Sequence, residues 1–219
     1  MKNFIENNKW YILGFVGLAG LGVATALLFE RFFNLKNPNP KKILFVGDSI
    51  STGESTYPAI IRRDRSDLQI DTLSEGGRRT DWMLENLKSK LASNKYDRVY
   101  IYGGVNDAFS TTPISSILSN VQSMVNLINE NGADAFIISG YVVDGFMDLS
   151  KFTPSKYVTE VSGFIPLIDR YKQYQSSLFK TIKNAKIIKP INLGNRTRDG
   201  IHPNGEGQRI IANEVLKTI

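Results

Sequence analysis

Short apolar segments alternate with longer amphipathic segments between residues 43 and 219, and this alternation limits the folds that the chain can adopt. Residues 43–46 are four apolar residues in succession, which is typical of a strand buried on both faces. We expect further strands at 69–73, 99–102, 135–138 and 187–188, and helices at 57–65, 80–91, 113–131, 167–182 and after Asn204. Such an order predicts an α/β fold with a parallel five-stranded sheet covered by helices on both faces.

The helix near residue 113 carries the clearest local signals. Thr112 is the predicted N-cap, and Pro113 is the predicted first helical residue, where its missing N–H breaks no hydrogen bond. Gly132 is the expected end of this helix. Apolar residues recur on one face between these limits, namely Ile114, Ile117, Leu118, Val121, Val125 and Ile128. At the start of the last helix, Asn204 is the predicted cap.

A second constraint comes from residues 10–29, which contain no charged side chain. As a helix these 20 residues would span roughly 30 Å, the thickness of one hydrocarbon core. Trp10 lies where an interfacial aromatic residue is expected. We therefore predict an amino-terminal flank at 1–9, a transmembrane signal anchor at 10–29, a linker at 30–42 and one domain at 43–219.

The role and orientation of this apolar run leave alternatives open. Gly20 and Ala24 have the spacing that lets two membrane helices pack closely, so they are candidates for self-association; a plain anchor is the alternative. A cleaved signal peptide would use the pattern Ala24-Thr25-Ala26, but the apolar run continues to Phe29. Lysine and arginine counts weakly favour a cytoplasmic domain. The chemistry inferred below favours the outside, so the side stays open.

Composition removes several classes of function. The chain has no cysteine and one histidine, which excludes disulfide scaffolds, thiolate metal sites and multi-histidine metal sites. We expect neither a metal nor another cofactor. The net charge of +6 is scattered along the chain rather than gathered into a basic stripe. The sequence therefore predicts no binding to nucleic acid.

Polar residues follow the first predicted strand in the segment 47–53, Gly-Asp-Ser-Ile-Ser-Thr-Gly. Ser49 comes directly after the buried strand, on a tight turn at the carboxyl edge of the sheet. Ligand sites of parallel α/β sheets form at this edge. Taken alone, the tripeptide Gly-Asp-Ser favours an ordinary turn in which the serine caps a helix.

Two further strands end in glycine-rich segments. The segment 74–80 contains Gly76 and Gly77, which permit a backbone N–H to face a cleft but match no phosphate-binding loop. The segment 103–107, Gly-Gly-Val-Asn-Asp, places Asn106 at the same edge if the strands are neighbours. A side-chain amide is a neutral donor suited to a developing oxyanion, although asparagine is also common in turns.

The single histidine, His202, lies three residues after Asp199 in Asp-Gly-Ile-His-Pro. Within one loop, the carboxylate can accept a hydrogen bond from one imidazole nitrogen and leave the other free for a serine proton. This is the arrangement of a nucleophile, a base and a residue that orients the base. An isolated histidine is more often a surface or core residue, so the motif gains weight only together with the others.

In combination, the four motifs resemble those of the SGNH (GDSL) hydrolase family, over about residues 43–219. The resemblance implies a flavodoxin-like, doubly wound three-layer fold and metal-free esterase chemistry. It implies that Ser49 is the nucleophile, His202 the general base and Asp199 the residue that orients it. The implied oxyanion donors are the Ser49 N–H, the N–H of Gly77, with Gly76 as the alternative, and the Asn106 side chain. The sequence departs from the family pattern at Ile50 and Arg79, where leucine and a small hydroxyl residue are usual.

The sequence indicates less about the substrate than about the fold or the candidate catalytic residues. Residues 141–166 form a long connection whose aromatic residues, Phe146, Phe152, Tyr157 and Phe164, are candidates for a substrate lid or for a satellite cluster that packs on the fold. The expected partner is an ester substrate, either an O-acetylated polysaccharide or peptidoglycan or a lipid acyl ester. A non-catalytic glycan-binding or structural module and an O-acyltransferase are the alternatives.

Overall fold

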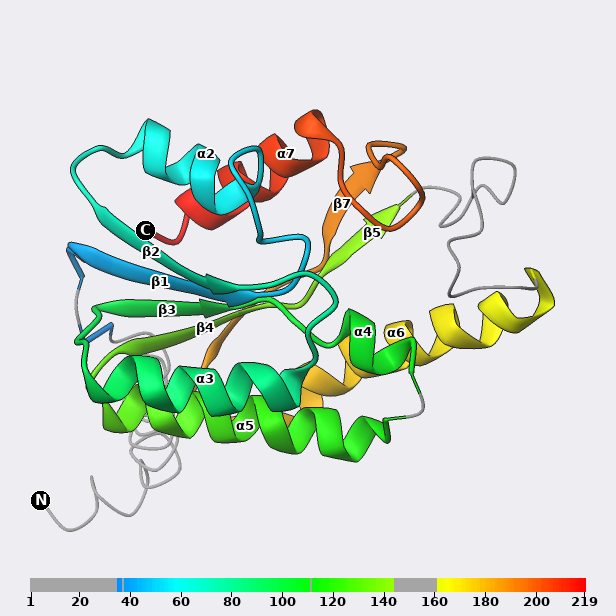
Figure 1. The fold of residues 1–219 in the computed structure, drawn as a ribbon, viewed down its shortest axis with the longest axis horizontal. Coiled ribbons are helices and arrows are strands. Elements are labelled where there is room, and N and C mark those ends of the chain that lie inside the picture. Colours follow the sequence, from blue (N-terminus) through cyan, green and yellow to red (C-terminus); the bar gives the residue numbers. More distant parts are fainter. Residues whose placement is uncertain (1–34, 37, 111, 144–160) are drawn as a thin grey trace, which may run out of the picture. The chain divides into compact units, whose positions relative to one another are not determined.

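Five parallel strands form the central sheet in a computed structural model of the chain, which describes residues 35–219 except 37, 111 and 144–160 (Figure 1). In spatial order they are β2 (Gln69–Ser74), β1 (Lys42–Gly47), β3 (Arg98–Ile101), β4 (Asp134–Ile138) and β6 (Lys186–Ile188). All four pairings are parallel. This is the flavodoxin-like order of a doubly wound sheet, so the predicted α/β fold with a parallel sheet is confirmed.

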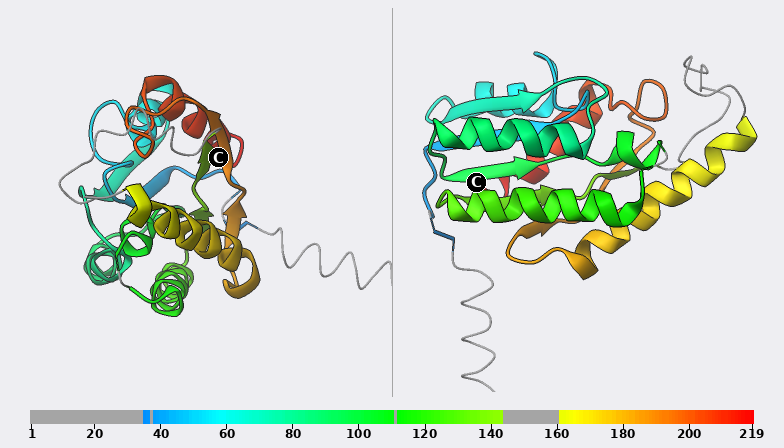
Figure 2. Two further views of the ribbon diagram at one scale, coloured as in Figure 1. Left: turned by 90° about the vertical axis from the view of Figure 1, so that its right-hand side faces the viewer. Right: turned by 60° about the horizontal axis from the view of Figure 1, so that its bottom comes forward.

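Helices cover both faces of the sheet (Figures 1 and 2). On one face lie α2 (Tyr57–Asp64) and α7 (Gly205–Leu216), which contact each other. On the other face, α3 (Thr80–Ala92) lies beside α5 (Ile114–Glu130), and α5 contacts α6 (Val161–Thr181). The three layers arise because each helix turns one apolar face to the sheet.

The apolar run 43–46 lies entirely within the core, since all four of its side chains have zero exposure. Phe45, Tyr100 and Phe136 lie opposite one another on three adjacent strands. Their ring centroids are 5.1 Å and 4.7 Å apart in stacked pairs. Offset aromatic pairs add to the free energy gained by burial, so this row stabilises the pairing of β1, β3 and β4.

The predicted start of α5 is wrong by a single residue, and α6 begins at Val161, six residues before its predicted start. Pro113 is the N-cap of α5 rather than its first helical residue, because its ψ of 139° is extended. The hydroxyl of Thr112, the predicted cap, instead lies 2.9 Å from the hydroxyl of Ser110. At α7 the predicted cap is confirmed, because the Asn204 side chain accepts a hydrogen bond from the Gly207 N–H at 3.0 Å.

The sequence patterns missed three short elements. The helix α4 (Val105–Ala108) follows β3, and the strands β5 (Tyr141–Val143) and β7 (Ile191–Gly194) form a separate parallel pair. These strands follow β4 and β6 after breaks of two residues. Elements of three or four residues carry no measurable periodicity. They matter here because α4 carries Asn106 and β7 leads into the loop that carries His202.

The predicted membrane segment 10–29 and the possible self-association residues Gly20 and Ala24 lie outside the described residues. Within the described part, no helix is long and apolar enough to cross a membrane. Part of the predicted linker contacts the domain. The backbone N–H of Lys36 donates to Asp134 at the start of β4, and those of Lys41 and Lys42 donate to Asp97, just before β3. The chain therefore enters the domain at the amino edge of the sheet.

Gly104, which begins α4, provides a test of the packing. Its φ is +99°, and a Cβ atom there would lie 2.4 Å from the Tyr174 ring. Gly132 has a similar φ of +93°, but nothing lies within 4 Å of a Cβ placed on it. We expect Gly132→Ala to lower the free energy of unfolding by about 1 kcal/mol through backbone strain, and Gly104→Ala by about 3 kcal/mol, because overlap adds to strain. Urea unfolding followed by circular dichroism measures both losses, and equal losses would contradict this packing.

Candidate active site

The carboxyl ends of β2, β1 and β3 meet at one edge of the sheet, because β1 pairs with both neighbours. Ser49 follows β1, Gly76 and Gly77 follow β2, and Asn106 lies in α4 directly after β3. A Cβ atom placed on Gly76 would lie 3.9 Å from the Cβ of Ser49. The three glycine- and serine-rich turns are thus brought together by strand order, with the Ser49 turn in the middle.

Ser49, His202 and Asp199 form a continuous chain of hydrogen bonds. The Ser49 hydroxyl lies 3.0 Å from His202 Nε2, although the two residues are 153 positions apart. On the other side of the ring, His202 Nδ1 lies 2.7 Å from an Asp199 carboxylate oxygen. The histidine and aspartate side chains are 32% and 43% exposed. When the ring proton is on Nδ1, it forms a hydrogen bond to Asp199. Nε2 then carries no proton and can accept the one from Ser49.

Asp199 is held as a charged hydrogen-bond acceptor. Its second carboxylate oxygen accepts hydrogen bonds from the backbone N–H groups of Ile201 (3.0 Å) and His202 (2.7 Å). Partial burial raises the pKa of Asp199, but the hydrogen bonds from His202 and Ile201 outweigh burial and hold the pKa below its usual range. The carboxylate is therefore ionised near neutral pH and fixed in the orientation that it needs toward the imidazole.

Gln208, which the sequence reasoning missed, fastens the start of α7, just after the loop that carries His202, to the serine turn. Its side-chain amide donates to the Ile50 carbonyl at 3.1 Å and accepts from the Tyr57 N–H at 2.8 Å. The residue is only 4% exposed. In the sequence, Gln208 lies on the same helical face as Ile211 and Val215, and a polar residue on an apolar face indicates a buried hydrogen-bonding role. A buried amide with both ends bonded is costly to remove, so it fixes the position of α7 against Ser49.

Asn106 joins the serine turn to the turn after β2. Its side-chain N–H₂ donates to the Arg78 carbonyl at 3.0 Å and lies 3.4 Å from a carboxylate oxygen of Asp48. The second contact is long for a hydrogen bond, so this N–H is only weakly engaged. The structure thus places Asn106 between two of the candidate site segments.

Asp107, another residue that the sequence reasoning passed over, anchors α3 next to the site. Its buried carboxylate accepts hydrogen bonds from the Thr80 backbone N–H at 3.0 Å and from the Thr80 hydroxyl at 2.7 Å. Thr80 is the first residue of α3 and directly follows the turn that contains Gly77. Asp107 therefore ties this turn to the turn that carries Asn106.

Asp48 is a fully buried carboxyl group directly before Ser49. One of its oxygens accepts a hydrogen bond from the Ile50 N–H at 3.0 Å. The pKa of Asp48 is raised from 3.8 to about 7, because burial and, to a smaller extent, the nearby charge of Asp107 raise it more than the hydrogen bond from Ile50 lowers it. The sequence pattern identified Gly-Asp-Ser as a turn but gave no sign that its aspartate titrates near neutral pH.

Ser49 borders a cavity of about 290 Å³ at the amino-terminal ends of α2 and α7. Its lining consists of Ser49, Thr52, Gly53, Glu54, Ser55, Thr56, Arg198, Pro203, Asn204, Gly205 and Gln208. The described part of the chain contains no group of three or more carboxylates, histidines or cysteines that could hold a metal ion. Three candidate lid residues, Phe146, Phe152 and Tyr157, lie outside the described residues, and the side chain of Phe164 in α6 is not described.

Comparison with known proteins identifies a family match. Residues 45–210 match the model of the GDSL-like Lipase/Acylhydrolase family. An arylesterase of Vibrio mimicus is 26% identical over 188 residues, which cover 82% of this chain and 88% of that protein.

Several solved structures share the fold. An acetyl xylan esterase superposes with a TM-score of 0.62 at 16% identity, covering 81% of this chain and 99% of its own. A member of the lipolytic G-D-S-L family from Veillonella parvula gives 0.60 at 15% identity, covering 82% and 98%. A psychrotrophic esterase from Pseudoalteromonas sp. gives 0.55 at 18% identity, covering 81% and 95%. At these identities the superpositions establish the fold.

The titration of Asp48 leads to a prediction about stability. Below pH 4 its carboxyl is protonated in both states. Between pH 4 and 7 it ionises in the unfolded chain but stays protonated in the folded one, so stability falls as pH rises. For a shift from 3.8 to about 7, the expected loss of unfolding free energy is on the order of 4 kcal/mol.

Asp48→Asn removes this titration, so its unfolding free energy should fall less between pH 4 and 8 than that of the native protein. Chemical unfolding at a series of pH values measures the two slopes. Asp67→Asn is the control, because Arg65 holds the pKa of exposed Asp67 at about 2, outside this range. Parallel curves for the native protein and Asp48→Asn would show that Asp48 does not titrate as described.

Proposed function

Because the chain belongs to the GDSL-like lipase/acylhydrolase family and is an ester hydrolase, we propose that Ser49, His202 and Asp199 form its catalytic triad. The observation that carries this proposal is the unbroken hydrogen-bond chain from the Ser49 hydroxyl through the imidazole to Asp199. The nucleophile–base distance of 3.0 Å lies within the range for proton transfer along a hydrogen bond.

The reaction proceeds in two acyl-transfer steps. His202 Nε2 takes the hydroxyl proton while Ser49 Oγ bonds to the ester carbonyl carbon, and Asp199 stabilises the imidazolium that forms. The bond to the leaving alcohol then breaks as His202 returns the proton to the alcohol oxygen. Water, activated by the same imidazole, attacks the acyl-enzyme, and Ser49 recovers its proton as the carboxylic acid leaves.

The oxyanion of each tetrahedral intermediate needs donors that are already in place. The proposed donors are the Ser49 N–H, the N–H of Gly77 or Gly76, and the Asn106 side chain. Asn106 holds the Arg78 carbonyl with one hydrogen at 3.0 Å, and the weak 3.4 Å contact to Asp48 leaves its other hydrogen available. One oxyanion donor is worth about 3 kcal/mol of activation free energy.

The acyl group is proposed to be short, with O-acetyl groups on polysaccharide or peptidoglycan favoured over long lipid acyl esters. The cavity beside Ser49 is small, about 290 Å³, and apart from Pro203 its described lining contains no aliphatic or aromatic side chain, whereas a long hydrocarbon chain gains binding energy only against such side chains. Consistent with this size, one structural relative is an acetyl xylan esterase.

We also propose that residues 10–29 anchor the chain in a membrane as a single helix and that the domain lies on the extracytoplasmic side. Support for the anchor comes from the uncharged run of 20 residues. Because residues 36–42 join the domain at the amino edge of the sheet, the anchor would connect at the end opposite to Ser49.

The triad predicts non-additive losses of activity. Ser49→Ala and His202→Ala should each lower kcat for p-nitrophenyl acetate by about a thousand-fold or more. Because the residues act as one unit, the kcat of the double variant should be no lower than that of either single variant. Ser176→Ala is the control, since this exposed serine bonds only within its own helix. Steady-state kinetics with the full-length chain measure the effects, and a double variant far below both single variants would contradict the assignment.

Membrane attachment and side can be measured together, because the natural chain has no cysteine. The full chain should stay in the membrane fraction after an alkaline carbonate wash. Lys88→Cys adds one thiol on the exposed surface of α3. A membrane-impermeant maleimide should label it in intact cells. Labelling only after lysis would place the domain inside, and release by carbonate would refute the anchor.

A further inference from the structure

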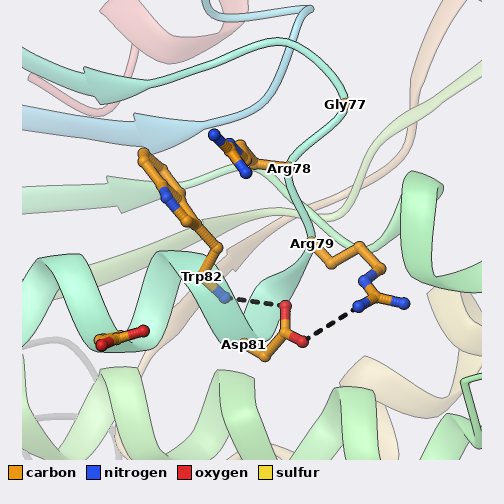
Figure 3. A pocket seen from close by; sticks show the side chains of 6 residues that line it. Gly77, Arg78, Arg79, Asp81 and Trp82 are labelled. Atoms are coloured by element: carbon orange, nitrogen blue, oxygen red, sulfur yellow. Dashed lines mark hydrogen bonds and ion pairs between the residues drawn. The ribbon is translucent and has the colours of Figure 1, made fainter.

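A second hollow, of about 430 Å³, lies at the start of α3, and none of the side chains that line it takes part in the mechanism above (Figure 3). It is lined by Gly77, Arg78, Arg79, Asp81, Trp82 and Glu85. Its volume is within the range of small-ligand sites. No aliphatic side chain lines it, so a hydrocarbon chain would gain little by entering it.

The charges of this hollow are balanced. Arg79 pairs with Asp81 at 3.4 Å, and Arg78 pairs with Glu75 at 2.5 Å. A charged ligand would meet side chains of its own sign as well as of the opposite sign. Guanidinium groups donate hydrogen bonds and carboxylates accept them, and both kinds of group are exposed here. This combination suits an uncharged ligand whose hydroxyl groups both donate and accept.

Trp82 adds a flat apolar surface to the polar lining. The Arg78 guanidinium lies over its indole ring, 5.3 Å from the ring centroid, and Figure 3 shows the two side chains next to each other. This contact restricts the orientation of the indole. A sugar ring has the complementary surface, with C–H groups on its faces and hydroxyl groups around its rim, so it can contact an aromatic ring and polar side chains at once.

The residues that line the hollow directly follow Gly76, which lies next to the serine turn. Gly76, the residue before Gly77, faces Ser49, and the Arg78 carbonyl accepts the hydrogen bond from Asn106. A ligand held by Arg78, Arg79 and Trp82 would therefore lie against the segment that supplies a proposed oxyanion donor.

We propose that this hollow is the subsite for the alcohol part of the ester and that it binds a neutral sugar ring of an acylated glycan. The inference rests on the proposed esterase function and adds to it the class of leaving group and the residues that recognise it. The small cavity at Ser49 takes the acyl group, while the Trp82 hollow takes the sugar.

The test compares two acetate esters with the full-length chain, p-nitrophenyl acetate and an O-acetylated xylo-oligosaccharide. Trp82→Ala should lower the ratio of kcat/KM for the oligosaccharide to that for p-nitrophenyl acetate by about ten-fold. Trp82→Phe should restore most of the ratio because it keeps an aromatic face. Arg79→Ala, at an exposed position that does not endanger folding, should lower the ratio as well. Phe179→Ala, which removes a 44% exposed aromatic ring from α6, is the matched control.

The outcomes separate this proposal from the one it rests on. If the native chain hydrolyses both esters and the variants leave the ratio unchanged, the sugar subsite is wrong and the triad stands. The subsite is also wrong if the native chain cleaves only p-nitrophenyl acetate, or if Trp82→Ala instead weakens hydrolysis of p-nitrophenyl octanoate. If Ser49→Ala retains the activity on both esters, the proposed catalytic mechanism itself fails.

Discussion

The parallel pairing of β1 with β2 on one side and β3 on the other is the constraint on which the site depends. Four successive side chains of β1 are completely buried, so this strand can occupy only the interior of the sheet. Because all three strands run in the same direction, the turns that contain Ser49, Gly77 and Asn106 emerge at one edge. A change in strand order would separate these residues without altering any of the local motifs.

Buried polar groups set the geometry at this edge more closely than the sheet alone can. Asp107 accepts hydrogen bonds at the start of α3, and Gln208 bonds both the serine turn and α2. Each is well bonded, which is the condition under which a buried polar group is tolerated. Asp48 is the exception: its pKa of about 7 reflects a carboxyl that burial disfavours in its charged form. Polar groups beside a nucleophile thus carry a cost in stability that the apolar sheet must offset.

Patterns within short segments predicted much of this arrangement. Apolar runs and helical periods predicted the five strands and the main helices. Serine, glycine, asparagine and histidine at strand or loop ends predicted the candidate site residues. The structure places Ser49, Asp199 and His202 in contact, and it places Asn106 against the Arg78 carbonyl. Of the two candidate oxyanion donors after β2, Gly76 is the one that faces Ser49.

What the sequence did not predict depends on contacts between distant segments. The strands β5 and β7 are stabilised by each other rather than by a local pattern, and Thr112 lost its predicted role because Ser110 bonds its hydroxyl. The clamp formed by Gln208 joins residues 151 and 158 positions away, which no local pattern reveals. The sequence likewise contains Arg78, Arg79 and Trp82 close to Gly77, but it does not indicate that these side chains line one hollow.

The proposed mechanism depends on the activation of Ser49 by His202 for attack on an acyl carbon. The most direct measurement is covalent labelling of the full-length chain with a p-nitrophenyl phosphonate ester, located by mass spectrometry of peptides. The account predicts one adduct, on Ser49, with labelling slowed by about a thousand-fold in His202→Ala. Labelling of another serine, or equal rates in the native chain and His202→Ala, would contradict it.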